Sequence, residues 1–240
     1  MLSLFRHRNF ALLWFAALVS YTGDWILITV LPFYVYDQTG STLASGMVWI
    51  AQALPGLVLG SFAGVFVDRF DRKPLMVVSR TLQVVPSLAL ILAVRDGPLW
   101  VVYPSVFVIA TLTQLFAPAE NALLPNLIAA DRLIDANVLN AMNDNFARIL
   151  GPVIGGLILS QSGLQGAVIA NAATFLGAAI LLWLIRASSL ALPSGTDVEV
   201  QRTSIWRDWI AGLRLVFRGG TIRLLFIVVA ISVLADSMLS

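Results

Sequence analysis

The chain has 240 residues, of which 59% are hydrophobic and 12% are charged, and its formal net charge is +2. Soluble domains carry about 25% charged residues, so this composition is implausible for a water-soluble globule. A lipid bilayer removes the problem because apolar side chains can face its hydrocarbon. The small net charge gives no indication of a nucleic-acid partner. We therefore expect an integral protein of the inner (plasma) membrane.

Residue types that carry enzyme chemistry are scarce. The chain has no cysteine, and its one histidine, His7, stands between Arg6 and Arg8. This excludes disulfides, thiolate metal sites and cysteine nucleophiles. No Walker loop, zinc spacing or Ser-His-Asp set is available either. We expect no enzymatic activity, no metal and no cofactor, and hence no ATP-driven transport by this chain alone.

Six apolar stretches are each long enough to cross a bilayer, which takes roughly 20 helical residues. In chain order they cover residues 9–36, 43–67, 74–94, 99–120, 137–160 and 165–185, and a seventh begins near 221. The short breaks at 37–41, 95–98 and 161–163 contain glycine or proline, as turns do. The pattern predicts an all-α membrane fold. Its parts are a six-helix bundle over 1–186, a cytoplasmic linker over 187–220 and an incomplete seventh helix over 221–240.

The distribution of Lys and Arg predicts the orientation. Cytoplasmic connections carry an excess of both residues. With the N-terminus in the cytoplasm, twelve of the fifteen lie inside, and Arg95 alone lies outside. Arg80 and Arg148 fall within spans. Residues 205–217 of the linker show helical spacing of apolar residues, which predicts an amphipathic helix at the membrane surface or one that packs against protein.

A charged motif lies between the second and third spans. Residues 64–73 read Gly-Val-Phe-Val-Asp-Arg-Phe-Asp-Arg-Lys. This resembles the cytoplasmic signature of the major facilitator superfamily, Gly-x-x-x-Asp-Arg-x-Gly-Arg-Lys, with Asp71 in place of the second glycine. A carboxylate beside arginines can form charge-assisted hydrogen bonds that hold one conformation and release another. The resemblance implies a cytoplasmic gate built from the matching residues, Gly64, Asp68, Arg69, Arg72 and Lys73.

Within that superfamily the chain resembles the drug and siderophore exporter branch, which includes enterobactin- and macrolide-efflux proteins. The residues that carry this resemblance are Gly23-Asp24, Val35-Tyr36, Thr39-Gly40-Ser41, Pro118-Ala119, Pro125 and Gly212-Leu213-Arg214. It implies the N-terminal half of a twelve-helix transporter. We therefore expect a fragment whose missing partner is a C-terminal six-helix half. The expected activity is secondary export of a small amphiphilic molecule, coupled most simply to protons, by rocking of the two halves.

A second motif lies in the fifth span. Gly151, Pro152, Gly155 and Gly156 resemble the end of the superfamily's antiporter motif, Gly-Pro-x-x-Gly-Gly. Small residues four apart let helices approach closely. Helix packing is the expected role, and the resemblance implies that this face meets helices of the second half.

Charged residues inside a membrane are costly and are therefore candidates for function. Asp24 lies roughly 22 Å and Arg148 roughly 17 Å along their spans from the same side. The resemblance places both spans around a central cavity. We hypothesise that Asp24 is a protonation or cation site and that the charge of Arg148 acts on it. The alternative is a static buried pair that fixes helix packing.

Two further acids are weaker candidates for transport coupling. Glu120, at the end of the fourth span, is either a gate partner for the arginines of the 68–73 loop or a solvated end residue. Asp144 lies about two turns into the fifth span. The arginine usual in the middle of the family's fourth span is absent here, and Thr113 and Gln114 are the nearest polar residues.

Two other functions remain open. One is a lipid or lysolipid flippase of the same fold, because the cavity residues do not define the substrate. The other is a membrane module without transport activity, which assembles as a homodimer or anchors a partner. The solutes that the protein moves, if any, would discriminate among the three.

Overall fold

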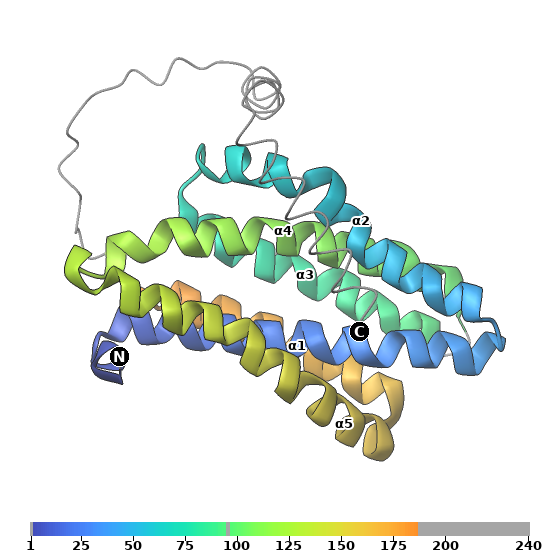
Figure 1. Ribbon diagram of the computed structural model, residues 1–240. Helices are drawn as coiled ribbons and strands as arrows, with labels where there is room; N and C mark the ends of the chain where they lie inside the picture. The colour runs from blue at the N-terminus through green and yellow to red at the C-terminus, as the bar shows by residue number, and fades with distance from the viewer. Residues whose placement is uncertain (1, 95–96, 187–240) are drawn as a thin grey trace, which may run out of the picture. The chain divides into compact units, whose positions relative to one another are not determined.

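The computed structural model describes residues 2–94 and 97–186 (Figure 1). Five long helices follow one another: α1 (Arg8–Thr39), α2 (Thr42–Val67), α3 (Arg72–Val94), α4 (Val102–Leu127) and α5 (Leu133–Trp183). Short 3-10 helices cover Leu2–Arg6, Leu99–Val101 and Ala130–Arg132. The described ranges contain no strand. The expected linker and seventh helix lie outside the described residues.

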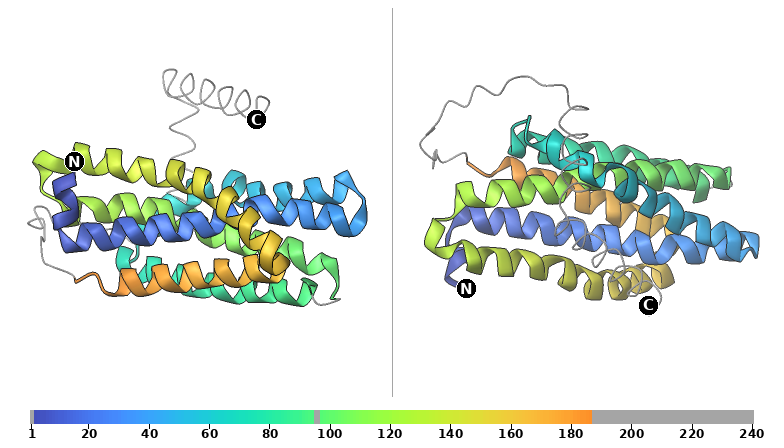
Figure 2. Two further views of the ribbon diagram at one scale, coloured as in Figure 1. Left: turned by 90° about the horizontal axis from the view of Figure 1, so that it is seen from below. Right: turned by 45° about the horizontal axis from the view of Figure 1, so that its top comes forward.

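Helix α5 consists of two membrane-crossing segments. A straight helix of its 51 residues would be roughly 77 Å long, more than twice the hydrocarbon thickness. Gly163 interrupts it with φ 63° and ψ −169°, a backbone conformation that favours glycine. The chain reverses direction there, so residues 164–183 run in the opposite direction to residues 133–162 (Figures 1 and 2). The five long helices therefore provide six spans, as the sequence predicts.

The turn between α1 and α2 shows how local sequence ends one span and begins the next. Gly40 takes φ 63° as the C-cap of α1, and its N–H bonds to the carbonyl of Tyr36. Ser41 is the N-cap of α2, and its side-chain oxygen accepts from the N–H of Ala44. Glycine adopts the left-handed conformation without steric cost, and serine satisfies a free helix donor. The turn predicted at 37–41 is confirmed.

The helices bury their apolar faces in two clusters. Helix α1 packs chiefly on α5, α5 also packs on α3, and α4 packs on both α2 and α3. One cluster contains Phe10 and Phe116, and the other contains Ile26 and Phe175. Along α1 and α3 the buried polar side chains lie between these clusters, and they are Ser20, Ser79, Arg80, Gln83 and Ser87. A polar layer therefore crosses the middle of an otherwise apolar bundle.

The glycine motif of α5 packs within this bundle. A Cβ at Gly151 would lie 2.4 Å from the Cβ of Trp25, and one at Gly155 would lie 3.3 Å from a methyl of Val30. Both partners belong to α1. The expectation that this face meets a second half is therefore wrong for these two glycines. Gly156 differs, because a Cβ there would meet no described atom within 4 Å.

Candidate functional site

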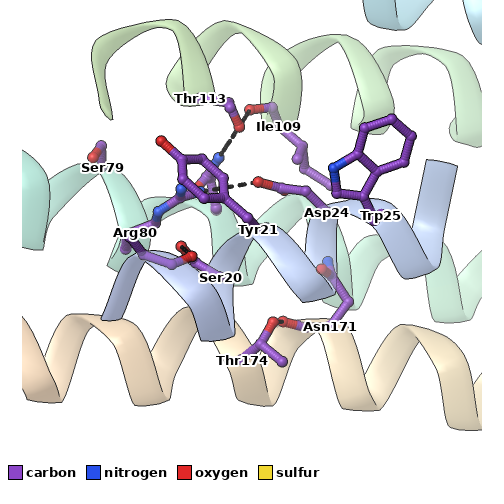
Figure 3. A network of polar contacts seen from close by, with 12 residues as sticks. Ser20, Tyr21, Asp24, Trp25, Ser79, Arg80, Ile109, Thr113, Asn171 and Thr174 are labelled. Atoms are coloured by element: carbon purple, nitrogen blue, oxygen red, sulfur yellow. Dashed lines mark hydrogen bonds and ion pairs between the residues drawn. The ribbon is translucent and has the colours of Figure 1, made fainter. Parts of the chain in front are cut away.

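An ion pair joins α1 and α3 in the polar layer. Nη1 of Arg80 lies 3.4 Å from Oδ2 of Asp24 (Figure 3). The arginine side chain is fully buried, and that of the aspartate is 13% exposed. A charge in a span is stable when an opposite charge accompanies it. The structure therefore gives Asp24 a partner other than the expected Arg148.

Arg80 is held by more than its carboxylate. Its Nη1 also donates to Oε1 of Gln83 at 2.9 Å, and Nε2 of Gln83 donates to Oγ1 of Thr113 at 2.8 Å. The guanidinium carbon lies 3.9 Å from the ring centre of Phe116, a cation–π distance. Its Nε and Nη2 have no hydrogen-bond partner among the described residues. Arg80 of α3 thus contacts α1 and α4, and two of its nitrogen atoms remain able to donate to another acceptor.

A second buried acid lies on α4. Glu120 is 2% exposed, and its Oε2 accepts a hydrogen bond of 3.0 Å from the hydroxyl of Tyr21. The ring centre of Tyr21 is 5.7 Å from the guanidinium carbon of Arg80. The interpretation of Glu120 as a solvated end residue is wrong, because the bundle encloses it. Its hydrogen bond goes to α1 rather than to the 68–73 loop.

Asp24 borders a cavity of about 210 Å³ between α1, α2 and α4. The other lining residues are Leu27, Ile28, Leu31, Gln52, Val106, Ile109, Ala110, Thr113 and Gln114. Mostly apolar walls with a few polar groups are typical of small-molecule sites. The aspartate therefore connects this cavity to the buried arginine. We name this arrangement of Asp24, Arg80, Gln83 and Thr113 the central ion-pair site.

Arg148 contacts the neighbour of Asp24. Its guanidinium carbon lies 5.4 Å from the ring centre of Trp25, and the indole Nε1 of Trp25 donates to Oδ1 of Asp144 at 3.0 Å. Asp144 and Arg148 are four residues apart, so they share one face of α5. Both side chains are exposed. Charged groups at this depth are unstable against lipid, so this face requires water or protein beside it.

The structure places the charged motif at the end of the bundle where α1 begins. The N–H of Asp68 bonds to the carbonyl of Gly64 at the end of α2. A cavity of about 570 Å³ is lined by residues 68–74 with Leu123 and Asn126 of α4. Lys73 donates from Nζ to the carbonyl of Ile185, beyond α5. The motif residues thus gather where α2, α3 and α4 meet.

Several residues of the polar layer are not distinguished by the sequence as functional residues. Arg80 was identified as a charge within a span, and the rule that singled out Asp24 applies equally to it. Tyr21 and Gln83 carry no comparable signal, because neither side chain is charged at neutral pH. Gly23 lets α5 approach, since a Cβ there would lie 1.9 Å from Oγ1 of Thr174.

Six apolar spans, a buried ion pair beside a cavity and a charged motif at one end are consistent with a multi-pass membrane protein of the major facilitator type. The chain belongs to the family described as "Transmembrane secretion effector", which it matches over residues 1–239.

Three curated relatives agree with this assignment. The uncharacterized MFS-type transporter YfiS of Bacillus subtilis is 29% identical over 75% of this chain and 43% of its own length. The multidrug efflux pump Tap of Mycolicibacterium fortuitum is 31% identical over 90% and 54%. Macrolide efflux protein A of Streptococcus pyogenes is 26% identical over 76% and 45%. The chain spans about half the length of these relatives.

Proposed function

We propose that this chain provides one half of a secondary active exporter for a small amphiphilic molecule, with Asp24 as the site of proton coupling. The observation that carries the proposal is the Asp24–Arg80 pair at the wall of the cavity between α1, α2 and α4. We further propose that the chain lies in the inner (plasma) membrane with its N-terminus in the cytoplasm. The excess of Lys and Arg in the alternate connections supports this orientation.

The coupling follows from charge balance. An ionised Asp24 attracts Arg80 and so draws α1 and α3 together. A proton on Asp24, or a cationic group of the substrate beside it, removes that attraction. Arg80 then turns to other acceptors, and its unpartnered Nε and Nη2 favour such a change. The proton and the substrate would thus shift the same equilibrium, which is the one between paired and separated positions of α1 and α3.

The exposed charges of α5 support a second half. Asp144, Trp25 and Arg148 form a polar face that lipid does not accommodate. We propose that a second six-helix half lies against it, across a water-filled cavity open to one side at a time. The motif at 64–73 would act as the gate at the cytoplasmic end.

Two features support an amphiphilic substrate. The cavity beside Asp24 is mostly apolar and carries one carboxylate, two amides and one hydroxyl. The names of two relatives specify macrolide efflux and multidrug efflux. An apolar body with a polar or basic group would therefore complement this cavity.

The test is transport by the native protein in proteoliposomes with an imposed pH gradient. The panel contains a macrolide, a lipophilic cationic dye and a lysolipid. We expect wild-type protein to move a macrolide or dye, and Asp24→Asn to abolish the dependence on the gradient. Asp131→Asn, which alters an exposed acid outside the cavity, is the matched control.

Other outcomes point elsewhere. Unchanged gradient-driven transport by a stably inserted Asp24→Asn variant would contradict the coupling role and favour a static packing pair. Movement of the lysolipid alone would favour a flippase. A wild-type protein that moves no solute would favour a membrane module without transport activity.

A further inference from the structure

A second charged cavity lies at the end of the bundle, away from the central ion-pair site. It has a volume of about 520 Å³ and is lined by Arg8, Lys73, Trp183, Leu184, Ile185 and Arg186. Three cations therefore surround one space. No Asp or Glu from the described ranges lines it. A cavity walled by one sign of charge attracts a ligand of the opposite sign.

Hydrogen bonds hold these residues in place. Nδ2 of Asn9 donates to the carbonyl of Arg186 at 2.7 Å, and the N–H of Arg186 donates to Oδ1 of Asn9 at 3.3 Å. Nζ of Lys73 donates to the carbonyl of Ile185. The starts of α1 and α3 are thus both tied to the chain beyond α5. An ammonium has three donors, so Lys73 retains donors for a ligand.

The helix termini add to the positive potential. Arg8 is the first residue of α1, and Lys73 is the second residue of α3. A helix N-terminus carries a partial positive charge, so a cation there is unfavourable. An anion in the cavity would offset both the side-chain charges and the helix dipoles.

The apolar part of the cavity indicates the level of the membrane surface. Trp183 ends the last described span and is 69% exposed, and Leu184 follows it. Tryptophan is enriched where hydrocarbon meets water. The cavity therefore offers cations and an exposed indole side by side. A free phosphate ion would satisfy the cations alone, whereas a phospholipid would satisfy both.

We propose that this cavity binds the phosphate headgroup of an anionic phospholipid, held by Arg8, Lys73 and Arg186, with the start of its acyl chains against Trp183. Guanidinium groups match phosphate oxygens in a bidentate manner, and basic pockets between membrane helices bind anionic headgroups. Lys73 also lines the cavity of the 68–73 loop. The lipid would therefore lie directly beside the proposed gate.

Tryptophan quenching tests the proposal. The native protein is reconstituted in phosphatidylcholine vesicles that contain equal mole fractions of either brominated phosphatidylglycerol or brominated phosphatidylcholine. Bromine quenches an indole that it contacts. We expect stronger quenching by phosphatidylglycerol, and we expect Trp183→Phe to remove the excess. Equal quenching by the two lipids, or an excess that survives Trp183→Phe, would overturn the proposal.

Arginine variants test the charge requirement. Arg8→Gln and Arg186→Gln should each weaken the preference for phosphatidylglycerol roughly fivefold, whereas Arg8→Lys and Arg186→Lys should largely retain it. Arg132→Gln, outside this cavity, is the matched control. A preference that survives both glutamine substitutions would refute the site. If these variants do not fold, the quenching of wild type compared with that of Trp183→Phe still tests whether phosphatidylglycerol occupies the cavity.

Inorganic phosphate separates the two sources of the anion. Millimolar phosphate should leave most of the phosphatidylglycerol preference, since the lipid also contacts Trp183. Complete loss of the preference at that phosphate concentration would mean that the cavity holds a free phosphate ion, and the lipid proposal would be wrong.

Discussion

The guanidinium of Arg80 lies 3.4 Å from the carboxylate of Asp24, and these residues stand 56 positions apart in the chain. The arginine is fully buried beneath aromatic rings, and the aspartate borders a cavity. One charge is thus fixed inside the bundle while its partner is open to a ligand. This asymmetry supports the exchange of a proton or cation that we propose for Asp24.

Removal of Arg80 should destabilise the bundle. Arg80→Gln leaves the charge of Asp24 without its partner in the membrane interior, and breaking a buried pair from one side costs about 3 kcal/mol. We expect a lower midpoint of thermal unfolding in detergent. The double variant Arg80→Gln/Asp24→Asn should recover part of that loss, because no unpaired charge remains. Additive effects of the two substitutions would show that the pair contributes no coupling energy.

The Tyr21–Glu120 hydrogen bond should contribute measurably to stability. Tyr21→Phe removes the donor and leaves a buried carboxyl oxygen unsatisfied, which costs about 2 kcal/mol. The unfolding midpoint checks this. Tyr103→Phe is a matched control, because that hydroxyl donates to a backbone carbonyl rather than to a buried acid and its loss should cost less. Equal stability of the Tyr21→Phe variant and wild type would contradict a stabilising hydrogen bond between Tyr21 and Glu120.

The glycines of α5 should differ sharply in their tolerance of alanine. Gly151→Ala places a methyl group 2.4 Å from the Cβ of Trp25, so α1 and α5 must separate. We expect a lower yield of folded protein and a lower unfolding midpoint. Gly156→Ala meets no described atom within 4 Å and should be neutral. The reverse order of the two variants would show that the Gly156 face, rather than the Gly151 face, is the packed one.

The polar face of α5 should be accessible to water. The chain has no cysteine, so the labelling of a single introduced thiol reports on that position alone. We expect Arg148→Cys in the native protein to react with a hydrophilic maleimide, at a rate that substrate changes. Phe175→Cys, at a fully buried position, is the unreactive control. Arg148→Cys that stays unlabelled under all conditions would contradict a water-filled cavity at this face.

Labelling can also test the orientation. Residues 7 and 38 lie at opposite ends of α1, and both side chains are exposed. With a cytoplasmic N-terminus, Gln38→Cys should react with a membrane-impermeant maleimide in intact cells. His7→Cys should react only after the cells are opened. The opposite pattern would invert the proposed topology.

The sequence by itself determined the class of protein and the six spans of the described residues. Apolar runs of sufficient length predict spans because a helix satisfies its own backbone polar groups in hydrocarbon. Gly40 and Gly163 predict turns because glycine adopts positive φ without steric cost, and both residues do so in the structure. The motif at 64–73 was equally visible, since its residues are consecutive. Asp24 was singled out because a charge within a span is rare.

Only the tertiary structure decided which charges meet. The sequence predicts similar depths for Asp24 and Arg148, yet Asp24 pairs with Arg80, and Arg148 lies over Trp25. Position along a helix sets depth, but rotation about the helix axis and the choice of neighbouring helix set the partner. Those depend on how all the packed faces fit together, as where Gly151 lets α5 approach α1. No local pattern in the sequence records that fit, so the central ion-pair site became visible only in three dimensions.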